Sequence, residues 1–372
     1  MPFERIYRGH YLCFTLGEEF TTNQVLKMRS SLLDEIKDTD GDLAFDLREL
    51  RSIDSAGLTF LKNVDEILKK AGRKSAFFGG PAEIQKLLTD FHPFNLFSSV
   101  VEFERDFHEI NPELNRTFLR LARGKGSVRS LQMSCPLCHY DSVAGFIVDD
   151  DMYQLSWSDT EIVPLFELVT PDVNAMDVST YQVAVCPKCF YAATRLDWFD
   201  VRFPEGSFES RLTKFQIGNL SNSAALRRNL AMSYEGASEP AFFQMPRESR
   251  AAYLAWKLNE FNLKHMQTER RITDGFEIVV SNFMMCKFAL HSRDIDDHMH
   301  TALAWLYNIL KNKTNYSTLR LAKAYTYIIS VLISQDKSKE AKNFYKQFAA
   351  EYKDQPDCQF WLNRAHDLVF FE

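Results

Sequence analysis

The sequence predicts three structural regions: an α/β domain over residues 1–107, a small mixed region over 131–222, and an all-helical domain over 223–372. Three observations support this fold class. Strand-like and helix-like apolar patterns alternate in the first region, two Cys-Pro-x-Cys motifs lie in the second, and apolar residues recur at helical spacing through the third. A chain of 372 residues, 45% of them hydrophobic, is long enough for two or three cores.

The α/β domain is expected to alternate strands and helices. Thr21 and Gln24 form a capping box, which predicts a helix start after the first strand. Leu58 and Leu61 begin the apolar face of a second helix, and Pro81 suits the first turn of a third. The predicted strands are Tyr11–Leu16, Leu43–Leu47, Ala76–Phe78 and Val100–Phe103. This order of elements indicates an α/β layer structure.

Three short motifs give this domain a resemblance to a known family. They are Asp46-Leu47 at a strand end, Ile53-Asp54-Ser55-Ala56-Gly57-Leu58 in a loop, and Gly79-Gly80-Pro81 before the third helix. Together they resemble the STAS family of the anti-sigma-factor antagonist type, over residues 5 to 107. The resemblance implies a domain that docks a protein partner, such as a kinase or an anti-sigma-like regulator.

The same resemblance nominates Ser55, with Asp54 beside it, as a candidate phosphoacceptor. In many STAS members the serine after this aspartate accepts a phosphate from a partner kinase. The antagonists usually carry a second small hydroxyl residue where this chain has Ala56, and relatives that serve lipid-transport complexes carry an Asp-Ser-Ala-Gly loop without phosphorylation. The alternative is that Asp54 or Ser55 only caps the following helix.

A basic connector is predicted over residues 108–130. Its first part, Pro112 to Leu121, has the spacing of a short helix, and Gly124-Lys125-Gly126-Ser127 interrupts the pattern. The basic side chains are Arg116, Arg120, Arg123, Lys125 and Arg129. Two interpretations stay open: a solvated helix with a hinge, or a patch for an acidic partner or an anionic surface.

Four cysteines form two matched pairs, Cys135-Pro-Leu-Cys138 and Cys186-Pro-Lys-Cys189. Two residues between cysteines let one turn present both thiolates to a single ion, and two such turns supply the four soft ligands of a tetrahedral zinc site. The sequence therefore predicts one closed structural Zn²⁺ site formed by Cys135, Cys138, Cys186 and Cys189. The alternatives are haem attachment at the Cys135–His139 pattern, a thiol–disulfide redox centre, and reduced thiols without metal.

The region around the cysteine pairs resembles a bacterial domain family of unknown function (number 2225), over roughly residues 130 to 330. The residues that carry the likeness are the two cysteine motifs, the Tyr191-Ala192 that follows the second, and the helical remainder. Family members usually place glycine after each second cysteine, whereas this chain has His139 and Phe190. Glycine tolerates a positive φ there, and phenylalanine does so poorly. The resemblance implies no known activity.

The last region shows helical patterns with short breaks. The helices are expected at Ala224–Tyr234, Pro246–Leu263, Thr273–His291, Met299–Lys311, Leu319–Ile333 and Ser338–Tyr352. Helix pairs stacked as in tetratricopeptide arrays are predicted, although the sequence has no clean repeat of that period.

Charge and composition disfavour several classes of function. The formal net charge of −6 disfavours nucleic acid as a partner, because phosphate binding needs a basic surface. The chain starts without a secretory signal and has no apolar run of membrane-spanning length, which predicts a cytoplasmic protein. It also lacks a nucleophile elbow, a Walker loop and a dinucleotide fingerprint. We expect a non-enzymatic regulatory or scaffold protein; an enzyme in the middle region and a nucleic-acid-binding zinc module are the alternatives.

Overall fold

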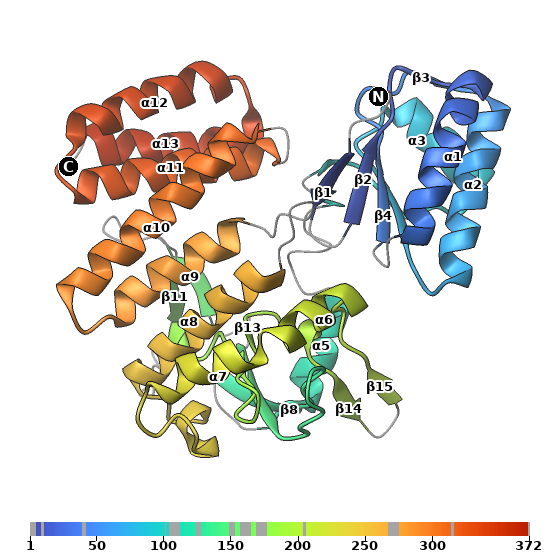
Figure 1. Ribbon diagram of the computed structural model, residues 1–372. Coiled ribbons are helices and arrows are strands. Elements are labelled where there is room, and N and C mark those ends of the chain that lie inside the picture. Colours follow the sequence, from blue (N-terminus) through green and yellow to red (C-terminus); the bar gives the residue numbers. More distant parts are fainter. Residues whose placement is uncertain are drawn as a thin grey trace. The chain divides into compact units, whose positions relative to one another are not determined.

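A computed structural model of the chain forms two compact units, Met1–Glu109 with Thr213–Phe215, and Ile110–Leu212 with Gln216–Glu372 (Figure 1). Each hydrophobic cluster among the described residues lies wholly within one unit. The structure describes residues 5–8, 11–38, 42–100, 102–103, 112–123, 128–148, 153–156, 165–168, 177–203, 206–266, 275–313 and 316–370.

The first unit is built on a five-stranded mixed sheet, in the order β1-β2-β4-β6-β7. Strand β2 pairs with β1 in the antiparallel sense, and the other neighbours are parallel. Two short strands, β3 (Glu19–Phe20) and β5 (Ser52–Ile53), pair with each other. The strands of the large sheet are β1 (Arg5–Arg8), β2 (Tyr11–Thr15), β4 (Asp42–Asp46), β6 (Ser75–Phe78) and β7 (Leu96–Phe97). The predicted α/β class is confirmed.

Three helices lie on one side of this sheet (Figure 1): α1 (Thr22–Asp38), α2 (Ser55–Lys70) and α3 (Ala82–Phe91). Successive strand residues point to opposite faces, so Phe14, Phe45 and Phe77 share the helix-covered face. Their rings stack with centroids 6.0 Å and 5.0 Å apart. Tyr11 and Phe78 lie on the other face.

The predicted last strand, Val100–Phe103, is wrong. The strand is β7, and Val100, Glu102 and Phe103 are helical. Polar side chains explain the difference, because the hydroxyl of Ser99 accepts a hydrogen bond from the amide of Glu102 at 3.1 Å and thereby caps a helical turn. That turn places the ring of Phe103 on Phe78, with centroids 4.3 Å apart, where it covers the sheet face that the helices leave open.

The second unit begins with α5 (Pro112–Leu121), which has the bounds that the sequence predicts. Two-stranded antiparallel sheets follow, and the two cysteine motifs lie beside two of them. The pairs are β8 (Val128–Met133) with β9 (Val143–Val148), β10 (Tyr153–Ser156) with β11 (Leu165–Leu168), β12 (Ala184–Val185) with β13 (Ala192–Ala193), and β14 (Val201–Phe203) with β15 (Gly206–Phe208). Arg116, Arg120 and Arg123 are exposed, while Lys125 lies outside the described residues.

The rest of the unit is mostly helical, as the sequence predicts for residues 223–372. The helices are α6 (Lys214–Asn222), α7 (Ala224–Met232), α8 (Ser249–Met266), α9 (Gly275–Phe288), α10 (Ser292–Lys311), α11 (Thr318–Ser334), α12 (Ser338–Tyr352) and α13 (Gln359–Phe370). Helix α12 has the expected bounds, α10 begins at Ser292 instead of Met299, and the sequence analysis did not foresee α13. Helix α11 packs against α10, α12 and α13 (Figure 1), which explains why every residue from Leu321 to Leu332 except Lys323 is buried.

None of the helices in the described residues combines the length and apolar character of a transmembrane segment. The likeness of the helices to tetratricopeptide arrays, and the boundary between residues 222 and 223, stay predictions.

Candidate functional site

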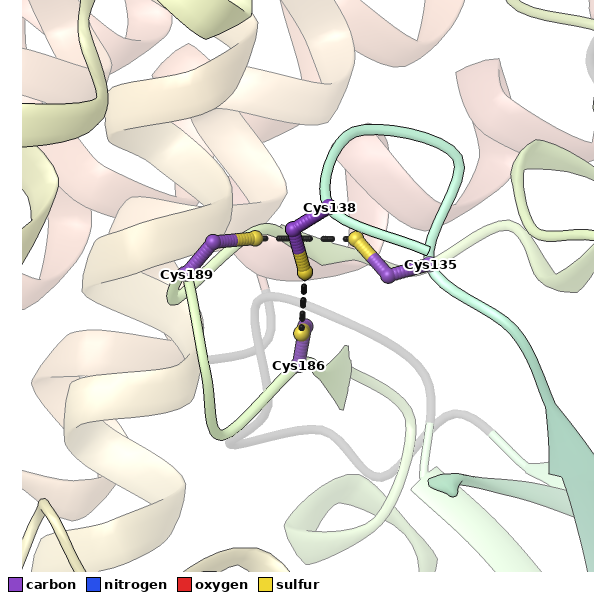
Figure 2. Close-up of side chains that lie close together, drawn as sticks. All are labelled: Cys135, Cys138, Cys186 and Cys189. Carbon is purple, nitrogen blue, oxygen red and sulfur yellow. Dashed lines mark hydrogen bonds between the residues drawn. The ribbon is translucent and has the colours of Figure 1, made fainter. Parts of the chain in front are cut away.

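The four paired cysteines converge on one point (Figure 2). Their sulfur atoms all lie within 4.8 Å of one another, and the shortest separations are 3.5 Å between Cys135 and Cys189 and 3.6 Å between Cys138 and Cys186. A disulfide needs about 2.05 Å between sulfurs, so all four are free thiols. A tetrahedron with metal–sulfur bonds of about 2.3 Å has edges of about 3.8 Å, which the observed separations approach.

The closest approaches run between the two motifs and not within either one. A thiol–disulfide centre of the Cys-x-x-Cys type needs its two sulfurs to meet inside one motif. Here Cys135 faces Cys189 and Cys138 faces Cys186, as the dashed lines of Figure 2 show. This crossed arrangement favours four ligands around one ion. Within the described residues, no other group of three or more cysteine, histidine or carboxylate ligands lies so close together.

The two motifs have the same local fold. In each, the amide of the first cysteine donates to the carbonyl of the tyrosine that ends the six-residue motif, and the fifth residue donates back to that cysteine's carbonyl. The bonds are Cys135 to Tyr140 (2.8 Å) with His139 to Cys135 (2.9 Å), and Cys186 to Tyr191 (2.8 Å) with Phe190 to Cys186 (2.8 Å). Backbone hydrogen bonds therefore hold both cysteines of each turn in place, and these bonds do not depend on the side chains of the two residues between the cysteines.

The residue after each second cysteine has a left-handed backbone. The φ angles are 56° at His139 and 59° at Phe190. This is the conformation that glycine adopts most easily, and other residues reach it at a cost of about 1–2 kcal/mol. The turn therefore keeps its shape without the glycine usual in the resembling family. His139 is exposed, whereas Phe190 is only 3% exposed and packs into a core cluster.

Burial and mutual interaction make four thiols without a cation unfavourable. Cys135 and Cys186 are fully buried, and the other two are half-buried. Hydrogen bonding with Cys186 and Cys189 raises the pKa of the Cys135 thiol, and burial adds to the rise. The pKa of Cys189 is lowered because Cys135 and Cys186 hydrogen-bond to its sulfur. The four sulfurs cannot all ionise side by side, and a divalent cation removes that repulsion. The cluster is compatible with a bound metal ion.

Asp54, in the loop before α2, forms hydrogen bonds with the starts of both α1 and α2. Asp54 caps α2, because its Oδ1 accepts a hydrogen bond from the amide of Gly57 at 2.8 Å. Its Oδ2 accepts bonds from the amide and the hydroxyl of Thr22, the first residue of α1, at 2.9 Å and 3.1 Å. The amides of Gly57 and Thr22 lower the pKa of Asp54. The capping role predicted for Asp54 or Ser55 therefore belongs to Asp54.

Ser55 is the first residue of α2 and is exposed. Its hydroxyl forms no hydrogen bond with any residue that the structure describes, because the cap is supplied by Asp54. Its position at a helix N-terminus suits an anion. Whether Ser55 carries a phosphate stays a prediction.

Two functional positions were not foreseen from the sequence. Gly57 was part of a motif without an assigned role, and a Cβ there would lie 2.4 Å from the carbonyl oxygen of Phe20 and 2.8 Å from Cγ1 of Ile53. Arg227, in α7, donates to the carbonyl of Cys189 at 3.3 Å. The contact of Gly57 with Phe20 and that of Arg227 with Cys189 have no signal in the sequence, because each joins segments that lie far apart along the chain.

A cleft of about 380 Å³ lies beside β8 and β9. Its lining residues are Ser130, Gln132, Ser142, Val143, Ala144, Phe146, Gln244 and Met245. None of these side chains titrates near neutral pH, so the cleft offers no acid or base for catalysis. It lends no support to an enzyme in the middle region.

The mixed sheet with helices on one face and the Asp54 loop define the first unit as a STAS domain, and residues 4–110 match the STAS domain family. Residues 130–210, which contain both cysteine motifs, match a family described as an uncharacterized protein conserved in bacteria (DUF2225). The chain is thus a STAS domain followed by a DUF2225 region and a helical C-terminal part.

One solved structure similar to this chain is that of the anti-sigma factor antagonist SpoIIAA in its unphosphorylated form. The identity is 16%, over 28% of this chain and 94% of that chain, with a TM-score of 0.25. At that score the likeness supports no further conclusion. No curated protein matches the chain.

Proposed function

We propose that this is a regulatory or scaffold protein that acts through protein–protein interaction, with its STAS domain docking a protein partner at the Asp54–Ser55 loop. The observation that carries the proposal is the exposed, unbonded hydroxyl of Ser55 at the start of α2. Exposed loops on a rigid scaffold are common binding sites. Asp54 makes this loop rigid by holding the starts of α1 and α2 together.

An exposed apolar side chain one helical turn beyond Thr22 extends this surface. Leu26, on the same helix as Thr22, leaves 65% of its surface exposed. A phosphate on Ser55 would add nearly two negative charges beside the ionised Asp54. The dipole of α2 offsets part of the repulsion within the domain, so the fold survives while a docked partner is repelled. The partner is then a kinase or an anti-sigma-like regulator.

Substitutions at Ser55 test this switch. Ser55→Asp should weaken binding to the partner that the wild-type protein captures in its native host, and Ser55→Ala should bind while accepting no phosphate. Thr89→Asp is a matched control. Thr89 is exposed on α3, so this substitution adds the same charge at another position of the domain. Binding is measured by titration, and phosphate on Ser55 by mass spectrometry. Equal affinity for all variants, with no phosphate on Ser55, would overturn the switch.

We also propose that the cysteine cluster holds one structural Zn²⁺. Four thiolates in a closed tetrahedral set are a ligand environment typical of structural zinc, with no open position for catalysis. Bound Zn²⁺ contributes to the folding free energy, because the unfolded chain has no preformed site. A reducing cytoplasm, which we expect for this protein, keeps the thiols available.

Metal analysis tests the centre. We expect one zinc per chain, and serine in place of Cys135, Cys138, Cys186 or Cys189 should abolish it and unfold residues 131–220. Cys286→Ser is the control, because Cys286 lies outside the cluster. Protein purified without chelator that contains no zinc would rule the centre out.

A further inference from the structure

Arg227 is a fully buried cation next to the cysteine cluster. Its exposed surface is 0%, although it lies on the short helix α7, outside both cysteine motifs. Its Nε donates to the carbonyl of Cys189 at 3.3 Å, and its Nη1 donates to the hydroxyl of Ser223 at 2.9 Å and to the carbonyl of Leu220. These bonds hold the guanidinium against the second cysteine motif.

No acid neutralises this guanidinium within the part of the chain that the structure describes. The buried Arg195, by contrast, pairs with Asp197 at 2.6 Å. A buried charge is costly to desolvate, and carbonyl groups alone compensate that cost less fully than a partner of opposite sign does. The Nε of Arg227 lies 3.3 Å from the carbonyl oxygen of Cys189, so the cysteine cluster is the source of negative charge that the structure places beside this guanidinium.

The proposed metal centre has an excess of that charge. Four thiolates around one divalent cation leave two negative charges in a largely buried place. An arginine stays protonated in proteins and cannot give up its charge to the thiolates. The two unfavourable buried charges, the anionic centre and Arg227, thus compensate each other.

We propose that Arg227 is the fixed counter-charge of the metal–thiolate centre and positions the Cys189 motif around the ion. The inference rests on the proposed zinc site. It makes α7 part of that site, and it predicts that metal affinity depends on a residue that carries no ligand atom.

A second buried arginine provides a matched control. Arg247 is 6% exposed, and it donates to the carbonyls of Thr180 and Val183 at 3.0 Å and 2.8 Å and to that of Phe243. Its guanidinium also lies over the ring of Phe146, 5.2 Å from the centroid. Its partners are carbonyl groups and aromatic rings, and none is a cysteine. Loss of this arginine removes a buried cation without removing charge from the cluster.

Metal affinity of the full-length protein is the first measurement. Arg227→Met should weaken Zn²⁺ binding by about 10- to 100-fold in chelator competition, the range found when a group behind the metal ligands is lost. Arg227→Lys keeps a positive charge and should recover part of that loss. Arg247→Met should bind Zn²⁺ nearly as tightly as the wild-type protein, even where it unfolds more easily.

The absorption of the cobalt-substituted protein separates charge from packing. A positive charge beside the sulfurs lowers the energy of their lone pairs, so charge transfer from sulfur to Co²⁺ requires more energy. In Arg227→Met this band should move to longer wavelength, in Arg227→Lys it should stay near the wild-type position, and in Arg247→Met it should not move. Arg227→Gln provides the same comparison if the methionine variant does not fold.

The outcomes distinguish two failures. Wild-type affinity and an unmoved band in the Arg227 variants would overturn the counter-charge. A wild-type protein that binds neither Zn²⁺ nor Co²⁺ would instead overturn the proposed centre on which it rests.

Discussion

His139 and Phe190 show how one backbone requirement is met by two different side chains. Both residues follow the second cysteine of their motif, and both have a positive φ, of 56° and 59°. His139 is exposed, whereas Phe190 shares a core cluster with residues of the helices. The strain is thus similar at both positions, but only Phe190 compensates for it by packing.

Glycine at these two positions should have opposite effects on stability. His139→Gly removes a strain of about 1–2 kcal/mol, offset by about 0.5–1 kcal/mol of extra chain entropy, and should leave the protein as stable or up to ~1.5 kcal/mol more stable. Phe190→Gly also loses a buried aromatic side chain and should cost about 3–5 kcal/mol. Urea unfolding of the two variants with metal present measures the difference. A loss of the same size in both would show that burial does not decide the outcome.

Gly57 has a role that its place in the Asp-Ser-Ala-Gly loop does not reveal. A methyl group at this position would collide with the backbone of Phe20, so Gly57→Ala should lower the stability of the STAS domain by about 1–3 kcal/mol. Gly17→Ala is the control, because nothing lies within 4 Å of a Cβ built there; its effect should stay within about 0.5 kcal/mol. Chemical denaturation of both variants checks the pair, and equal stability would contradict the contact.

At the scale of elements, one carboxylate links two helices. Asp54 caps α2 through Gly57 and binds both polar groups at the first residue of α1. Each helix start has amides without an intrahelical partner, and Asp54 satisfies amides at both. One side chain therefore links the starts of α1 and α2, and the strength of this link depends on the charge state of Asp54.

That dependence predicts a pH effect with a defined sign. The pKa of Asp54 in the folded protein is lowered from its ordinary value of 3.8. Its contribution to stability is therefore complete above that value and is lost as the pH falls through the lower, folded pKa. Asp54→Asn should be less stable than the wild-type protein at neutral pH, and the difference should shrink below about pH 4. Denaturation of both proteins between about pH 6 and pH 2 measures it; a difference that grows on acidification would contradict the assignment.

At the scale of the whole molecule, the second cysteine motif joins the cysteine cluster to the helices. Asn262 of α8 donates to the carbonyl of Ala192 at 2.8 Å, just beyond this motif. Val185, Phe190 and Ala192 also belong to the core cluster that contains Trp256 of α8. The STAS domain has core clusters of its own, composed of its own residues.

Metal removal should therefore loosen the second unit and spare the first. With a chelator, amide hydrogen exchange should accelerate in residues 131–220 and in α8, because α8 packs on the second motif. Helix α12, which packs on α11 and α13, should respond less, and α2 of the STAS domain should keep its protection. Hydrogen exchange read by mass spectrometry, with and without chelator, tests this order. Equal acceleration in α2 would contradict the independence of the two cores.

The amino-acid sequence by itself determined the features that arise from local periodicity and motif spacing. The bounds of α5 and α12 agree with the apolar pattern, because a helix face is defined by residues three and four positions apart. Both cysteine motifs and the STAS loop were likewise visible, since each is a short run of neighbouring residues.

Only the tertiary structure decided what depends on contacts between distant segments. It made Leu96–Phe97 the last strand, because β6 pairs with that segment while Ser99 caps a helical turn over the apolar residues that follow. It placed Phe20 against Gly57, and it buried Arg227 beside Cys189. The physical reason is common to all three: the energy of a strand pairing, a steric contact or a buried charge depends on its partner, and no local pattern names a partner that lies far away along the chain.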